Sequence, residues 1–238
     1  MEPIVSILAI CAILLLAGFA CGLLERGNFS LRWLLGGIAL VALNDALLTN
    51  FYGLLPTAFP QLEWNWQGKA LALVATLAIA AHPAIGWQRV GLTFRQREGS
   101  LKSAVPVALA YCAFFLAIAM FFPGDDRSTE TIAFQLTMPS LEEESFYRGL
   151  LLFAFYEAFR GQARLLGVDW SWGALLSCLA FGLAHAFAYS DGAFAFDPIY
   201  FALTAVPSAL AVWMRLRTGS LLLPILLHSV GNALPLML

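Results

Sequence analysis

Residues 141–148 read LEEESFYR, three consecutive carboxylates and an arginine, and they decide how the whole chain is interpreted. They lie inside an apolar segment that runs from residue 131 to residue 159. A charged side chain near the centre of a bilayer costs from about 2.5 to about 10 kcal/mol or more, so such residues usually face the protein interior or a water-filled cavity. We therefore interpret the stretch first as a functional site.

The spacing of the charges along a helix assigns them different tasks. Glu144 and Arg148 are four residues apart, so they share a helix face and can form an ion pair. Glu143 points about 100° away from Glu144, and the residues three and four positions after it are aromatic rather than basic. A buried carboxylate without a cation has the proton affinity that a general base needs. The role of Glu142 stays open: it lines a cavity, pairs with a residue elsewhere or is protonated.

The composition of the chain identifies its class. Hydrophobic residues make up 61% of the 238 residues and charged residues only 12%, which is typical of a polytopic membrane protein. The 13 basic and 15 acidic residues are nearly balanced and form no basic stripe, so nucleic-acid binding is excluded as a function class. The four cysteines are scattered through apolar segments without the spacing of a metal site or a disulfide framework.

The apolar runs predict the number of membrane spans, because a spanning helix needs about 20 mostly apolar residues. Eight runs meet this requirement: residues 4–24, 33–54, 69–87, 103–122, 131–159, 171–189, 196–214 and 219–236. We therefore expect an all-α, polytopic transmembrane helical bundle in one integrated membrane domain. Residues 1–130 carry its first four helices, and residues 131–238 carry the last four, which we expect to form the catalytic core.

The charges of the connections predict the topology, because cytoplasmic loops are enriched in Lys and Arg. Alternate connections carry Arg26 and Arg32, then Arg89, Arg95, Arg97 and Lys102, then Arg160 and Arg164, then Arg215 and Arg217. The other connections are acidic or nearly neutral, with Glu63, Asp125, Asp126, Arg127, Asp191 and Asp197, and with Lys69 as a further cation. We therefore expect a multi-pass protein of the cell membrane with both termini on the non-cytoplasmic side.

Two histidines in the last helices each have a partner four residues away on the same helix face. Phe181 precedes His185 by one turn, and Asn232 follows His228 by one turn. If the fifth, sixth and eighth helices are neighbours, these polar groups and Glu143 converge on one chamber.

Such a chamber supports hydrolysis of a peptide bond by a water molecule that a carboxylate activates. Glu143 would take the proton from water, and His185 would orient the water or share the proton. His228 and Asn232 would donate hydrogen bonds to the developing oxyanion.

Two other readings of these residues remain open. In the first, two histidines and a glutamate bind catalytic zinc; the absence of a His-Glu-x-x-His helix and the poor zinc affinity of Asn232 disfavour it, so we expect no cofactor. In the second, the protein is not a protease but a proton-coupled transporter or a bacteriocin-immunity or scaffold protein. A transporter accounts for charges in a membrane but not for the joint spacing of the motifs.

The ordered motifs resemble those of the CPBP family, which includes type II CAAX prenyl endopeptidases and bacterial Abi or lysostaphin-resistance-A-like proteins. They are Glu143-Glu144-x-x-x-Arg148, Phe181-x-x-x-His185 and His228-x-x-x-Asn232. The resemblance implies a glutamate-dependent intramembrane endopeptidase. By position, Glu143 matches the catalytic glutamate, His185 its partner on the water, and His228 and Asn232 the oxyanion pair, with Glu144, Arg148 and Phe181 in support.

The resemblance also implies the class of substrate. We expect a membrane-anchored peptide or protein segment, with or without an attached lipid, as in CAAX-type or sorting-tail processing. The lipid bilayer is the other expected partner.

Overall fold

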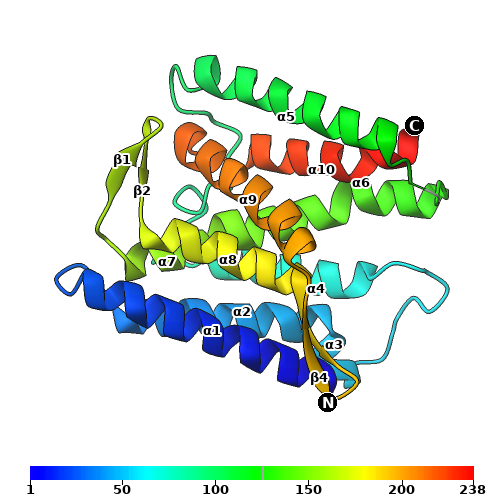
Figure 1. Cartoon of the computed structure of the whole chain (residues 1–238), viewed down its shortest axis with the longest axis horizontal. Coiled ribbons are helices and arrows are strands. Elements are labelled where there is room, and N and C mark those ends of the chain that lie inside the picture. Colours follow the sequence, from blue (N-terminus) through cyan, green and yellow to red (C-terminus); the bar gives the residue numbers. More distant parts are fainter. Residues whose placement is uncertain (125) are drawn as a thin grey trace.

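The computed structural model describes residues 1–124 and 126–238, and most of this chain is helical (Figure 1). Asp125 of the predicted acidic connection lies outside the described residues. The helices are α1 (Glu2–Leu24), α2 (Leu31–Leu48), α3 (Asn50–Gly53), α4 (Trp66–Ala80), α5 (Leu101–Phe121), α6 (Thr129–Glu143), η1 (Glu144–Leu151), α7 (Leu152–Ala158), α8 (Trp172–Ala186), α9 (Pro198–Thr218) and α10 (Leu222–Met237). Two short antiparallel hairpins pair β1 (Ala163–Leu165) with β2 (Val168–Trp170) and β3 (Phe187–Ser190) with β4 (Ala193–Phe196).

The prediction of a helical membrane bundle is confirmed. Each of the eight apolar runs corresponds to a helical segment, with α3 extending the second run and α6, η1 and α7 together forming the fifth. By length and composition, α1, α2, α5 and α9 are long and apolar enough to cross a membrane, whereas α4, α8 and α10 are shorter apolar helices. The protein is therefore an integral membrane protein built from helices.

The fifth segment differs from the single α-helix that the sequence predicts. It changes from α-helix to π-helix between Glu143 and Glu144 and returns to α-helix at Leu152. A π-helix bonds each N–H to the carbonyl five residues earlier, so its turns are wider, and such turns often occur at functional sites. The acidic stretch thus lies at the junction of two kinds of helix, and the angle inferred from an ideal α-helix does not hold beyond it.

This segment lies at the centre of the bundle and is packed on several sides. α6 packs against α4 and α10, while α7 packs against α2 and α8. Phe155 on α7 is fully buried. Gly37 on α2 and Gly173 on α8 both face it so closely that a Cβ atom at either position would overlap its ring or its backbone. Small residues at these contacts let the helices approach closely, which holds the acidic stretch in place.

The connections with opposite charge lie at opposite ends of the bundle. At one end the basic connections bond to each other, since Arg97 N–H donates to the Thr218 carbonyl and Leu221 N–H to the Gly91 carbonyl. At the other end, Asp191 N–H donates to the Glu2 carboxylate. Both termini lie on the right-hand side of Figure 1, at this second end. Both termini thus lie at the same end of the bundle, while the number of membrane crossings and the side of the membrane that each end faces stay predictions.

Candidate functional site

A cavity of about 500 Å³ lies between the central segment and α4, α5, α8, α9 and α10. Its lining includes all four residues that the sequence predicts to be catalytic: Glu143, His185, His228 and Asn232. The structure therefore brings together side chains that come from three separate helices, α6, α8 and α10.

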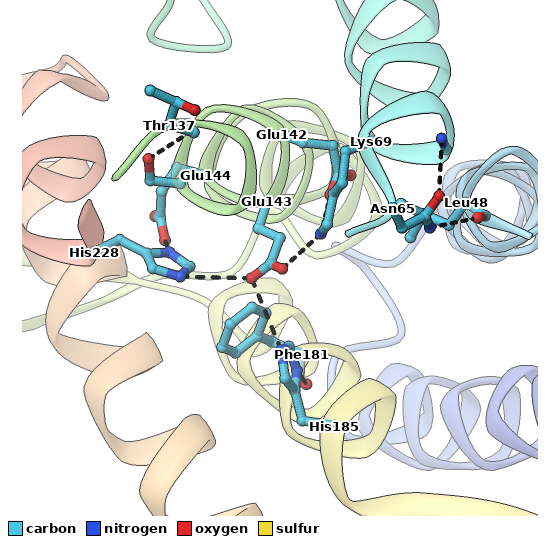
Figure 2. A network of polar contacts seen from close by, with 12 residues as sticks. Leu48, Asn65, Lys69, Thr137, Glu142, Glu143, Glu144, Phe181, His185 and His228 are labelled. Atoms are coloured by element: carbon cyan, nitrogen blue, oxygen red, sulfur yellow. Dashed lines mark hydrogen bonds and ion pairs between the residues drawn. The ribbon is translucent and has the colours of Figure 1, made fainter. Parts of the chain in front are cut away.

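Glu143 is the centre of the polar network in this cavity (Figure 2). Its Oε2 atom lies 3.8 Å from His185 Nε2 and 3.7 Å from His228 Nε2. Both distances are longer than a direct hydrogen bond. Both imidazoles thus face the same carboxylate oxygen of Glu143.

Lys69 on α4 is a further member of the site that the sequence interpretation missed. Its Nζ atom lies 2.6 Å from Glu143 Oε1 and 2.7 Å from Glu142 Oε2 (Figure 2). The Lys69 side chain is only 13% exposed, and that of Glu142 is fully buried. The expectation that Glu143 has no cation nearby is therefore wrong, because the cation comes from another helix. Glu142 takes the second of the roles left open for it, pairing with a residue elsewhere.

A signal for Lys69 was present in the sequence. It stands at the start of an apolar helix in a connection that is otherwise acidic or neutral. A lysine in such a segment needs a partner of opposite charge, and the three consecutive glutamates were the largest group of carboxylates available.

Glu144 connects an arginine and a histidine. The expected ion pair with Arg148 is present, with 3.3 Å between Arg148 Nη1 and Glu144 Oε1. The same oxygen accepts a hydrogen bond from His228 Nδ1 at 2.7 Å. This second contact was not predicted. It directs the other ring nitrogen of His228 toward Glu143, as a carboxylate does when it orients a catalytic imidazole.

His185 is oriented by contacts within and beside its own helix. Its Nδ1 lies 2.8 Å from the backbone carbonyl of Phe181. Because a carbonyl only accepts, Nδ1 carries a proton, and Nε2 is the ring nitrogen that faces Glu143. The Phe181 ring lies 4.4 Å from the His185 ring and has the guanidinium of Arg148 above it at 4.0 Å. Phe181 thus packs against the imidazole, and Arg148 packs against the ring of Phe181.

Asn232 lies one turn beyond His228 on α10 and also lines the cavity. Its Nδ2 atom donates to Gln135 Oε1 on α6 at 3.1 Å. The amide nitrogen has two hydrogens, so one remains for a further acceptor. Gln135 was not singled out from the sequence, because nothing in its local spacing links it to α10.

The contacts of Glu143 bear on the zinc alternative. Among residues 1–124 and 126–238, no group of three or more His, Cys, Asp and Glu side chains has the arrangement to hold a metal ion. A zinc ion bound to Glu143, His185 and His228 would also lie close to the ammonium of Lys69, which is 2.6 Å from Glu143. Repulsion between these two cations opposes zinc binding.

Comparison with known protein families gives a match to the second half of the chain. Residues 127–234 are similar to the family described as type II CAAX prenyl endopeptidase, Rce1-like. The matched segment contains Glu143, His185, His228 and Asn232 but not Lys69. No curated protein and no solved structure matches the chain.

Proposed function

We propose that the protein is a glutamate-dependent intramembrane endopeptidase, because residues 127–234 are similar to the Rce1-like family of type II CAAX prenyl endopeptidases. The observation that carries this proposal is the position of Glu143 Oε2, which lies within 3.8 Å of two imidazole nitrogens in a cavity inside the bundle. A carboxylate between two histidines is suited to activating a water molecule.

In the proposed first step, water sits between Glu143 and His185. It donates one hydrogen to Glu143 Oε2 and the other to the free Nε2 of His185, which leaves a lone pair on its oxygen for attack. Glu143 takes the proton as the water oxygen bonds to the carbonyl carbon of the substrate peptide. The same proton then passes to the amide nitrogen, the C–N bond breaks, and a carboxylic acid and an amine are released; the acid then gives its remaining proton to the amine or to solvent.

In this mechanism, His228 and Asn232 stabilise the negative charge that develops on the carbonyl oxygen of the substrate. Because His228 gives its Nδ1 hydrogen to Glu144, Nε2 can donate to the oxyanion only when the ring is an imidazolium. The Glu144 carboxylate, 2.7 Å away, is the counter-ion that such a ring needs. The second amide hydrogen of Asn232 is the other donor. Fixed donors of this kind act most strongly where water is scarce.

Lys69 is proposed as a positioning residue for Glu143. It holds Oε1 at 2.6 Å, so the other carboxylate oxygen is the one that faces the histidines. Glu142 neutralises the lysine from the opposite side. Holding a reacting group within a narrow range of orientations is a large part of enzymatic rate enhancement.

The proposed mechanism needs no metal ion, and this is testable on purified protein. We expect peptide hydrolysis to continue in an excess of a zinc chelator, because Lys69 already provides the positive charge next to Glu143. The measurement is the hydrolysis rate before and after chelation, together with the metal content of the protein by mass spectrometry. Loss of activity that added zinc restores would instead support the zinc-dependent version.

The proposed substrate is a membrane-anchored peptide or protein tail, with or without an attached lipid. Apolar side chains make up much of the cavity wall, among them Phe115, Leu203 and Met214. On the first half of α9, Leu203 and Val206 are 54% and 69% exposed. An apolar chain can therefore contact the protein both from the bilayer and inside the cavity.

Comparison of C-terminal peptides from the membrane proteome identifies the substrate class. Cells with the wild-type protein are expected to contain shortened C-termini that are missing from cells with Glu143→Gln at the same expression level. The sequence shared by these termini then serves to design peptides with and without a lipid for assays on the purified enzyme. Identical C-termini in both cells, with the wild-type phenotype retained, would support a scaffold or immunity role.

A further inference from the structure

A second cavity, of about 490 Å³, lies at the end of the bundle where the basic connections meet, away from Glu143. It is bounded by residues 89–100, by α7, by the β1–β2 hairpin and by the end of α9. The charged residues in its lining are five arginines and two acids: Arg89, Arg97, Arg164, Arg215, Arg217, Glu98 and Asp169. The cavity therefore carries an excess of positive charge.

Ion pairs neutralise only two of these arginines. Arg164 lies 2.9 Å from the Asp169 carboxylate, and Arg89 lies 3.0 Å from that of Glu157. Within the part of the chain that the structure describes, Arg97, Arg215 and Arg217 form no ion pair with a carboxylate. Three guanidinium groups thus face one cavity without a carboxylate at ion-pair distance, and Glu98 is the one acid of the lining left to offset their charge.

Arg215 is the most buried of the three, at 8% exposed. Its Nε and Nη2 atoms donate to the backbone carbonyls of Val90 and Arg89, at 3.3 and 2.8 Å. These carbonyls accept hydrogen bonds from the Arg215 N–H groups but carry no net charge, and burying a charge without a counter-charge is costly. An anion in the cavity would remove this cost.

The other two guanidinium groups are held in place by neutral partners. Arg97 Nη1 donates to the Leu216 carbonyl at 2.8 Å, and Arg217 Nε donates to the Ser103 hydroxyl at 2.7 Å. Arg217 Nη1 also donates to the Gly167 carbonyl at 3.4 Å. These contacts leave other N–H groups of both side chains for a ligand. Planar guanidinium groups fixed in this way are suited to binding phosphate oxygens two at a time.

We propose that this cavity binds a phosphate group, either the headgroup of an anionic phospholipid or free phosphate. The positive-inside rule accounts for arginines in exposed connections, but not for the burial of Arg215 beside a cavity. Apolar side chains, including Leu152, Phe153 and Val168, line the same space. A wall that is part cationic and part apolar suits a phospholipid, whose phosphate lies next to its glycerol and acyl chains.

Thermal unfolding of the detergent-purified protein with added ligand tests the site. Phosphatidylglycerol is expected to raise the unfolding temperature of the wild type, whereas phosphatidylcholine, which has no net charge, is not. In Arg97→Gln/Arg217→Gln, the affinity for phosphatidylglycerol should fall by at least about tenfold, because each lost guanidinium removes a charged hydrogen bond. Arg215 is kept, since it also ties residues 89 and 90 to α9.

Arg95→Gln is the matched control, since Arg95 lies in the same connection, is exposed and does not line the cavity. This variant also loses the positive charge of an arginine, and it should respond to phosphatidylglycerol as the wild type does. An equal shift with inorganic phosphate alone would identify free phosphate as the ligand. The proposal is overturned if phosphatidylcholine stabilises equally well, if the double variant keeps the full response, or if neither phosphate source has any effect.

Discussion

Glu143→Gln is expected to lower the hydrolysis rate by about 10²-fold to 10⁴-fold, the range that a general base contributes. The amide has nearly the same shape as the carboxylate but cannot accept the proton from water. The fold should survive, because Lys69 keeps its ion pair with Glu142 at 2.7 Å. The measurement is the turnover of a peptide substrate by purified protein, with the unfolding temperature recorded in parallel.

Glu63→Gln is the matched control for this change. Glu63 is exposed and lies in the connection before α4, and its only hydrogen bond among the described contacts is through its backbone N–H. The control should turn over substrate at the wild-type rate. A folded Glu143→Gln protein with unchanged turnover would remove Glu143 from the catalytic role and with it the proposed mechanism.

Lys69→Met is expected to reduce both stability and activity. It leaves Glu142 and Glu143 buried next to each other without their cation, and removing one partner of a buried ion pair typically costs about 3–5 kcal/mol. Activity should fall because nothing then holds Glu143 Oε1. Thermal unfolding and peptide turnover measure the two effects, and Lys102→Met, at an exposed lysine of α5, is the control.

The double variant Lys69→Met/Glu142→Gln separates positioning from charge balance. Removing the Glu142 charge as well leaves one buried carboxylate instead of two, so most of the lost stability should return. Activity should stay low, because Glu143 Oε1 still lacks the lysine that fixes its orientation. If activity returns together with stability, Lys69 serves only as the counter-ion of Glu142 and does not position the catalytic carboxylate.

Much of the architecture could be predicted because it depends on local sequence. Hydropathy located the eight helical segments, since any helix in a bilayer must present apolar side chains to lipid along its length. Helical spacing also predicted the Glu144–Arg148 pair, whose 3.3 Å contact lies within one helix. The change to π-helix after Glu143 was not predictable in this way, because the local sequence from 144 to 151 is compatible with an α-helix.

By itself, the sequence determined that this is a helical membrane protein and which three helices carry its conspicuous polar groups. Only the tertiary structure decided how those groups are paired. Lys69 is 74 residues from Glu143, and His228 is 84 residues from Glu144, yet both pairs are in contact. The physical reason is that helical periodicity relates residues on one helix only. Contacts between helices depend on how whole faces pack, which no spacing in the sequence records.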